Sequence, residues 1–400
     1  MEADNRGKQD ARSAFARVIH PLFFEHHDHL LREIKAGLDG PRLQVNTQRF
    51  HDGTPWLQVR PIGGSGTRAE LDGQTYANTA IVPLWISPQF GSVEASLYAT
   101  IQLGNAVTHT ESGRETPYVD RLLAVAPFLE IRQDRDSPLP NGQYRAGEAI
   151  NAEIFAKVLA ASGYREMIVL DPHSAQAYDY FTKAGIEMLP LTAAQLFADY
   201  LKQTMTPGSQ HRVVALDKGS LQRSLKFADA MGVDPVKQMV VLDKTRGVDG
   251  KIDELSVVYG SLEGADVIIY DDIIDTSGSI GKTCKKLKDE YGCRSITVLA
   301  THGVLSYPAV DNIIRYLGEG IVDRLIISDS LPNAQFNLQE IPGVEVVEVG
   351  GLLAEAAKTV ASSSVGAARQ DEKLSSHLLT PQAKQAVWEE FRDRITQSSG

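Results

Sequence analysis

The chain has 400 residues, 42% hydrophobic and 23% charged, so it can bury one large core or two medium ones and has an ordinary globular composition. Its formal net charge of −11 argues against non-specific binding of nucleic acid, so any recognition of phosphate has to be local. No apolar run approaches the length of a membrane span, and residues 1–17 lack the apolar core of a secretion signal. We therefore expect a soluble, cytoplasmic protein with no membrane partner.

The two cysteines agree with that compartment. Cys284 and Cys293 stand nine residues apart, within or just after one predicted helix, and we expect no disulfide between them. Neither is expected to ligate a metal or to act as a nucleophile.

The first 43 residues are predicted to form a helical extension with an amphipathic pattern. This segment carries a group of histidines that invites a metal-site interpretation, but a polar helix face explains them better. The group consists of His20, His26, His27 and His29.

From residue 44 onward the pattern alternates between apolar strands and amphipathic helices, which is typical of parallel sheets with crossover helices. The predicted strands span residues 80–86, 122–127, 167–170, 212–216, 239–242, 267–270, 295–300 and 324–328. We expect an α/β chain of two similar domains in tandem, with a boundary near residue 190. The predicted domains are residues 44–190 and 191–360, followed at 361–400 by a linker and a charged helix from about 381 to 395.

The most informative segment runs from Val267 to Ser279. An apolar strand leads into acidic residues and a hydroxyl-rich, glycine-containing turn, and a helical pattern follows from 280 to 290. The helix N-terminus offers unpaired backbone N–H groups, which together with the turn hydroxyls suit a phosphate monoester. Two aspartates at the end of the strand would hold vicinal sugar hydroxyls, directly or through a divalent cation. Helix capping alone does not need three aspartates at this spacing. The predicted sugar-phosphate site comprises Asp271, Asp272, Asp275, Thr276, Ser277, Gly278 and Ser279.

This segment resembles the phosphoribosyl-diphosphate loop shared by type I phosphoribosyltransferases and ribose-phosphate diphosphokinases (PRPP synthetases). Four further segments, in the order of the family, resemble the diphosphokinases alone. They are 132–135 (the "RQDR" motif), 170–174 ("DLHA"), 215–219 ("PDxGG") and 243–246 ("KxR"). The resemblance covers roughly residues 45–360 and leaves both ends of the chain as additions.

The resemblance implies two phosphoribosyltransferase-like domains and a Mg²⁺-dependent reaction. In that reaction the diphosphoryl group of ATP moves to the anomeric hydroxyl of ribose 5-phosphate, giving 5-phosphoribosyl 1-diphosphate (PRPP) and AMP. His173 and Asp217 match the family's positions at the magnesium–ATP site, while Lys244 and Arg246 match its catalytic flexible loop. The implied ATP-binding residues are Phe50, Asp52, Arg132, Gln133, Asp134 and His173. Because the family supplies the Phe50–Asp52 segment from a neighbouring subunit, the resemblance also implies a homo-oligomer.

Departures from the family pattern leave the acceptor open. Thr54 stands in place of an acidic residue, and the "PDxGG" loop has Lys218 and, for its second glycine, Ser220. A glycine that lets the backbone approach a phosphate is not readily replaced by serine without a change in geometry. The same chemistry on a larger ribose 5-phosphate derivative, such as ADP-ribose, is therefore an alternative, as is a noncatalytic regulator associated with a synthetase. A phosphoribosyltransferase would have one domain and no "RQDR" segment, and the sequence contradicts both.

Overall fold

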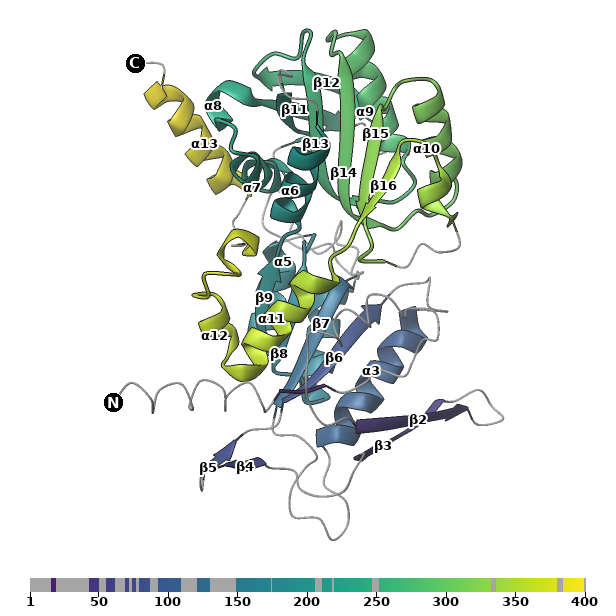
Figure 1. Cartoon of the computed structure of the whole chain (residues 1–400), viewed down its shortest axis with the longest axis vertical. Coiled ribbons are helices and arrows are strands. Elements are labelled where there is room, and N and C mark those ends of the chain that lie inside the picture. Colours follow the sequence, from purple (N-terminus) through teal and green to yellow (C-terminus); the bar gives the residue numbers. More distant parts are fainter. Residues whose placement is uncertain are drawn as a thin grey trace. The chain divides into compact units, whose positions relative to one another are not determined.

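The computed structural model describes residues 16–18, 43–49, 55–61, 69–71, 74–76, 79–86, 93–108, 121–129, 149–173, 175–205, 211–217, 219–246, 252–331, 336–379 and 384–398. These residues form two compact units, whose elements are labelled in Figure 1. Unit 1 comprises Met1–Leu191 and Gly350–Leu379, and unit 2 comprises Thr192–Val349 and Thr380–Gly400. The expected α/β architecture with mostly parallel sheets and flanking helices is confirmed.

Unit 1 is built on a five-stranded parallel sheet in the order β1-β6-β7-β8-β9. Its strands are β1 (Ala16–Val18), β6 (Thr79–Ile86), β7 (Arg121–Leu129), β8 (Glu166–Leu170) and β9 (Glu187–Leu191). Its helices are α3 (Val93–Thr108), α4 (Asn151–Ala161), α5 (Ala175–Lys183), α11 (Gly350–Ser362) and α12 (Val365–Ala368), with a 3₁₀ turn η4 (Ser375–His377). Two antiparallel hairpins complete it, β2 (Leu43–Arg49) with β3 (Pro55–Pro61) and β4 (Ala69–Leu71) with β5 (Gln74–Tyr76).

Strand β7 is apolar because helices cover both of its faces. Leu122, Ala124 and Ala126 pack into a core with α3, α4 and α5. Alternate residues of a strand face opposite ways, so Leu123 and Val125 point to the other side, and both are fully buried. Helix α11 contacts β7 and β8 and lies across them (Figure 1).

The position of α11 corrects the predicted domain limits. The division after Leu191 lies beside the predicted boundary, but the chain returns to unit 1 at Gly350, whereas the sequence placed everything to residue 360 in the second domain. Residues 364–379 also pack on unit 1, where the Arg369 guanidinium donates to the Met188 carbonyl at 2.7 Å. An amphipathic pattern shows that a helix has a buried face, but it does not show which sheet that face covers.

The predicted helical extension is also corrected where it is described, because Ala16–Val18 is a strand that pairs in parallel with β6. The rest of that segment, with its histidines, lies outside the described residues. The predicted C-terminal helix is present as α13 (Lys384–Ser398).

Unit 2 has a seven-stranded sheet in the order β12-β11-β10-β13-β14-β15-β16. Every pairing is parallel except that of the edge strand β12 with β11. The strands are β10 (His211–Ala215), β11 (Met239–Arg246), β12 (Ile252–Tyr259), β13 (Asp266–Ile274), β14 (Ser295–Gly303), β15 (Arg324–Ser328) and β16 (Val344–Val347). The helices are α6 (Ala194–Thr204), α7 (Leu221–Met231), α8 (Pro235–Gln238), α9 (Gly278–Asp289), α10 (Ala309–Gly318), α13 and the 3₁₀ turn η3 (Leu338–Glu340).

Both faces of the central strand β13 are buried in unit 2. Val267 and Ile269 belong to a core that includes residues of α9 and α10. On the opposite face the Tyr270 ring meets the rings of Phe197 from α6 and Phe227 from α7, each with its centroid at 5.5 Å. This two-sided burial explains why β13 reads as a nearly continuous apolar run.

Helix α13 contacts α7 and α8, beside which it lies in Figure 1. Val387 and Phe391 form its buried face, at 3% and 1% exposure, and the Phe391 ring packs edge-on against Tyr259 of β12 with a centroid distance of 5.4 Å. Helix α13 is therefore packed into unit 2. None of the helices in the described part of the chain has the length and apolarity needed to cross a membrane.

We predict that Phe391→Ala lowers the free energy of unfolding by about 3–5 kcal/mol, since it removes a fully buried ring from a packed site. Urea denaturation followed by circular dichroism measures the change. Glu390→Ala, an exposed position on the same helix, is the matched control and is expected to stay within about 0.5 kcal/mol of the parent. Equal stability of the two variants would contradict the packing of α13.

Candidate functional site at the switch point of the second sheet

The order of strands in unit 2 reverses between β10 and β13. From β10 the chain passes through α7 to β11 on one side, and from β13 it passes through α9 to β14 on the other. Ligands of open α/β sheets bind at such a reversal, outside the carboxyl ends of the strands. Asp217 follows β10 at this edge, and Asp271 and Asp272 lie near the end of its neighbour β13.

Strand β13 extends further than predicted. The predicted strand ends at residue 270, whereas β13 continues to Ile274 and pairs with β14 through Asp271↔Ala300 and Ile273↔His302. Backbone pairing with β14 thus includes Asp271 and continues past both aspartates, which the sequence pattern places at the end of the strand. The Asp271 side chain is 28% exposed and that of Asp272 is 6% exposed.

A buried arginine that sequence reasoning missed joins these two aspartates. Arg223 lies in the first turn of α7 and is 9% exposed. Its Nη1 is 3.3 Å from Asp271 Oδ1, and its Nη2 is 3.2 Å from Asp272 Oδ2. The planar guanidinium therefore spans both carboxylates. The sequence offered a single hint of this role, namely that Arg223 stands six residues after Asp217. That hint is weak, because an arginine in a helix usually lies on the surface.

Crowding of acidic groups perturbs Asp271. The pKa of Asp271 is raised to about 7; burial is the largest cause and the negative charge of Asp272 the next, while the Arg223 guanidinium opposes both effects. Hydrogen bonding to Asp272 and the charge of Asp217 add smaller increases in the pKa. This carboxyl group therefore gains or loses its proton near neutral pH.

The turn after β10 is closed by Ser220. The Ser220 N–H donates to Asp217 Oδ1 at 2.9 Å, and the Ser220 hydroxyl donates to the Asp217 carbonyl at 3.0 Å. With φ at −86°, Ser220 has a backbone conformation open to all residues, so the position where the family has its second glycine needs no glycine here. Lys218 lies outside the described residues.

The turn from β13 into α9 has the features of an anion cradle. Ser277 has φ at +61°, in the left-handed region, and only 4% of the residue is exposed. Its Oγ is buried and accepts or donates no hydrogen bond within the described part of the chain. Strain of this kind costs about 1–3 kcal/mol, as does an unsatisfied buried hydroxyl. Beyond it, α9 begins at Gly278 with no side-chain cap on its first N–H groups.

Helix α10 holds the cradle in place. The Asn312 amide donates to the Thr276 carbonyl at 2.9 Å. A Cβ at Gly281 would approach the Tyr316 ring to 2.0 Å, so the first turn of α9 and α10 pack closely only because residue 281 is glycine.

Buried hydroxyls support the strand ends beneath the cradle. Tyr270 directly precedes Asp271 in the chain. Its hydroxyl lies 3.2 Å from Thr192 Oγ1 and 3.0 Å from Thr301 Oγ1. The Ser330 hydroxyl donates to the Thr301 carbonyl at 2.9 Å and lies 2.8 Å from His302 Nδ1. Satisfied polar groups of this kind make the carboxyl ends of β13 and β14 rigid.

The predicted catalytic loop begins as a strand. Residues 243–246 belong to β11 and pair in antiparallel fashion with β12, through Lys244↔Leu255 and Arg246↔Ile252. The prediction of a loop from residue 243 is therefore wrong, because β12 supplies backbone hydrogen-bond partners that a polar sequence does not reveal. The following residues, 247–251, lie outside the described part.

Comparisons with known proteins match this architecture. A family model described as phosphoribosyl synthetase-associated domain matches residues 212–366. The ribose-phosphate pyrophosphokinase of Wolinella succinogenes is 30% identical over 238 residues, which are 59% of this chain and 69% of that protein. Ribose-phosphate pyrophosphokinase 1 of Streptococcus pyogenes serotype M3 is 30% identical over 239 residues, with 59% and 68% covered. The chain belongs to the ribose-phosphate pyrophosphokinase family.

The alignment spans a smaller share of the length of some other family members. The match to the Helicobacter hepaticus ribose-phosphate pyrophosphokinase is 31% identical over 212 residues, 53% of this chain, and spans 62% of that protein's length. In fold, the crystal structure of phosphoribosylpyrophosphate synthetase from Mycobacterium smegmatis is similar, with a TM-score of 0.65 at 22% identity over 87% of this chain and 98% of that one. The predicted family and its two phosphoribosyltransferase-like domains are thus confirmed.

The structure describes only some of the residues of this chain that are predicted to bind ATP or magnesium. His173 follows β8 in unit 1 and is exposed, two residues after Asp171, whose φ is +38°. Asp217 belongs to unit 2, so the two predicted metal ligands occur in different units. Phe50, Asp52, Arg132, Gln133 and Asp134 lie outside the described residues. Among the residues that are described, no group of three or more His, Cys, Asp or Glu side chains is arranged to hold a metal.

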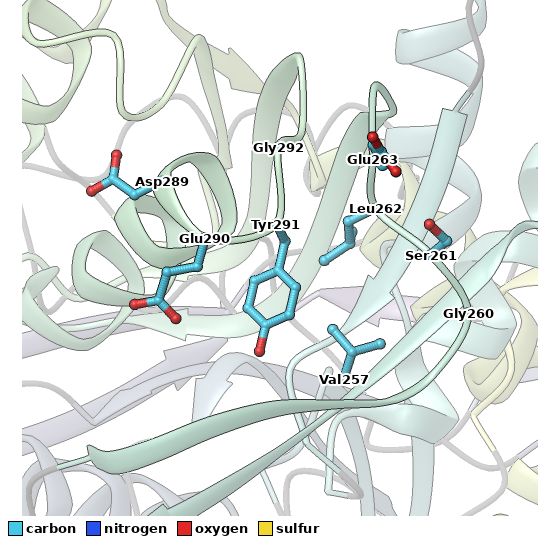
Figure 2. Close-up of a pocket in the computed structure, with 9 residues that line it drawn as sticks. All are labelled: Val257, Gly260, Ser261, Leu262, Glu263, Asp289, Glu290, Tyr291 and Gly292. Carbon is cyan, nitrogen blue, oxygen red and sulfur yellow. The ribbon is translucent and has the colours of Figure 1, made fainter.

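A separate cavity of about 470 Å³ lies in unit 2 between the turn after β12 and the end of α9 (Figure 2). Figure 2 shows Leu262, Tyr291 and Val257 there, with the carboxylates of Glu263 and Glu290 at its margin. None of the predicted site residues that the structure describes lines it. Residues that line the cavity form hydrogen bonds within unit 2. For example, the Tyr291 hydroxyl donates to the Leu255 carbonyl at 3.0 Å.

The raised pKa of Asp271 has a consequence for stability. A carboxyl with a folded pKa near 7 holds a proton that the unfolded chain releases above pH about 4, so the free energy of unfolding is expected to fall as pH rises from about 4 to about 7. Asp271→Asn should remove this fall, as measured by urea midpoints at about pH 5 and pH 8.

Asp266→Asn is the control for that measurement. Hydrogen bonding to Arg294 lowers the pKa of Asp266 to about 2, so its stabilising effect is complete above pH 4 and is lost only as pH falls toward 2. This variant should keep the parent's pH dependence between 5 and 8. Identical pH dependence in the parent and in Asp271→Asn would refute the assignment.

Proposed function

We propose that this chain transfers the diphosphoryl group of ATP to the anomeric hydroxyl of ribose 5-phosphate, forming PRPP and AMP. The observation that carries the proposal is the turn from β13 into α9, where the buried Ser277 hydroxyl and the first N–H groups of α9 directly follow the strand that carries the Asp271 and Asp272 carboxylates. Donors suited to a phosphate thus come a few residues after acceptors suited to hydroxyls, and a 5-phosphorylated ribose needs both. Membership of the pyrophosphokinase family supports the same conclusion.

In this reaction the anomeric oxygen attacks the β-phosphorus of ATP, and the bond from that phosphorus to the oxygen bridging it to the α-phosphorus breaks. AMP leaves with the bridging oxygen, and the hydroxyl proton is released. The protein's main tasks are to align the two substrates and to compensate negative charge.

The 5-phosphate would bind at Asp275–Ser279, with Asp271 and Asp272 accepting from the ribose hydroxyls. Lys244 and Arg246 would stabilise the transferring diphosphoryl group, a role for which ammonium and guanidinium donors are suited. Their place on the β11–β12 hairpin gives these residues a supported backbone that leads into residues 247–251.

Magnesium is the expected cofactor, held by Asp217 and His173, and when bound it would shield the charge of the polyphosphate. Carboxylate oxygens suit this ion and imidazole is a less common ligand, so the donor chemistry at Asp217 fits the proposal better than that at His173. The segment with Phe50 and Asp52 would complete the nucleotide site of a neighbouring copy in a homo-oligomer, and Arg132, Gln133 and Asp134 would contact ATP.

The test is an endpoint assay by mass spectrometry with ATP and Mg²⁺, in which ribose 5-phosphate and ADP-ribose are offered in separate tubes. We expect AMP and PRPP from the first tube. A diphosphorylated product from ADP-ribose alone would mean that the acceptor is the larger derivative. No AMP from either tube would contradict catalysis and favour a noncatalytic partner of a synthetase.

A double substitution tests the cationic pair. Lys244→Ala with Arg246→Ala is expected to lower turnover at least about tenfold, or about 1.4 kcal/mol of transition-state stabilisation, because the charge on the transferring group loses two cationic partners. Steady-state kinetics with both substrates saturating measures the effect. Lys237→Ala removes an exposed lysine just before β11 and is expected to leave turnover unchanged. A smaller loss in the double variant than tenfold would exclude this role.

A further inference from the structure

One hydrogen bond sets the orientation of the peptide that leads into the anion cradle. The side-chain amide of Asn312, on α10, donates to the Thr276 carbonyl at 2.9 Å. A trans peptide is planar, and its C=O and N–H groups point in opposite directions. Because the Thr276 carbonyl faces α10, the Ser277 N–H of the same peptide points away from that helix. This N–H makes no hydrogen bond within the described part of the chain.

The backbone of the next two residues gathers N–H groups into a concave site. Ser277 is left-handed, with φ at +61° and ψ at −4°, and Gly278 begins the right-handed helix α9. Left-handed and right-handed residues in succession form a nest, in which neighbouring N–H groups converge on an anion. The N–H groups of this nest belong to Ser277, Gly278 and Ser279. The buried Ser277 hydroxyl is a further donor in the same turn.

The 276–277 peptide has an alternative orientation that spoils the nest. Turning this peptide over by about half a turn changes Ser277 φ by a similar angle, from the left-handed region to the negative values that every residue favours. The rotation relieves the strain at Ser277, but it replaces the N–H donor with the Thr276 carbonyl, whose oxygen repels an anion. The strain of one left-handed residue and the strength of one hydrogen bond are similar in size, so the bond from Asn312 is able to decide between the two orientations.

A second contact on α10 fixes the Asn312 amide. The Arg315 guanidinium donates to Asn312 Oδ1 at 3.0 Å, so the oxygen of this amide is occupied and its nitrogen is turned toward Thr276. Arg315 in turn lies over the Tyr316 ring, 4.7 Å from its centroid, and Tyr316 packs closely against Gly281 of α9. Side chains of one helix therefore orient the donor that holds the cradle peptide.

We propose that Asn312 is a positioning residue of the sugar-phosphate site, which holds the 276–277 peptide so that the Ser277 N–H faces the 5-phosphate. This inference rests on the proposed function, because it takes a 5-phosphorylated sugar as the anion in the cradle. Asn312 acts through the backbone and does not contact the sugar. Without it, the apparent affinity falls to the fraction of molecules whose peptide has the receptive orientation. Bound substrate selects that orientation, so turnover at saturation is kept.

A double-mutant cycle in steady-state kinetics tests this role. Asn312→Ala is expected to raise KM for ribose 5-phosphate about five- to tenfold, with kcat within about twofold of the parent and KM for ATP unchanged. Glycine adopts positive φ without strain, so Ser277→Gly makes the receptive orientation independent of Asn312. In the Ser277→Gly background, we expect Asn312→Ala to raise KM by less than about twofold.

Asn105→Ala is the matched control, because it makes the same substitution at an exposed asparagine of another helix, α3. This variant should keep the parent's KM and kcat. If Asn312→Ala does not fold, Asn312→Ser takes its place in the cycle with the same expectation, since the serine side chain is too short to reach the Thr276 carbonyl.

The outcomes separate the positioning role from the proposed function. An unchanged KM for ribose 5-phosphate in Asn312→Ala, with or without a fall in kcat, overturns the role. The same fold increase in KM with and without Ser277→Gly also overturns it, because a loss of packing alone acts equally in both backgrounds. Either result leaves PRPP synthesis by the parent, and thus the proposed function, intact. A parent that forms no PRPP overturns the proposed function and this inference with it.

Discussion

The second unit depends on one electrostatic constraint. Aspartates gather where two adjacent strands, β10 and β13, end, and their negative charge has to be compensated. Asp217, Asp271 and Asp272 meet where the strand order reverses, and one buried arginine compensates part of their charge. Because Arg223 comes from the helix that follows β10, the helix, the turn before it and the end of β13 have to keep a common geometry. An α/β sheet concentrates its ligand-binding groups at this edge, so the constraint on stability coincides with the candidate site.

A second feature of the site is stored strain. Ser277 occupies left-handed backbone with a buried hydroxyl, and both are unfavourable in the absence of a ligand. The surrounding structure maintains this conformation through Asn312, which bonds the Thr276 carbonyl, and through the close packing of Tyr316 over Gly281. A cradle formed in advance loses little conformational entropy when an anion binds, which is the physical advantage of such strain.

Helix α13, which lies beyond the residues that resemble the family, shows how an added segment becomes integral to a fold. The chain leaves unit 2 after β16, covers the sheet of unit 1 with α11 and α12, and returns as α13 to pack on α7 and β12. Helix α7 carries Arg223, and β12 pairs with the strand that bears Lys244 and Arg246. The added helix therefore buries elements that also shape the candidate site.

The sequence by itself determined the family, the alternation of strands and helices, and the position of the phosphate turn, because these depend on local periodicity and on motifs whose residues are adjacent in the chain. Only the tertiary structure decided which sheet α11 covers, how far β11 and β13 extend, and that Arg223 joins Asp271 to Asp272. Backbone partners lengthened both strands, and those partners come from residues distant in sequence. The arginine could not be predicted because its importance lies in burial beside two carboxylates, and burial is a property of the packed sheet rather than of the helix that carries it.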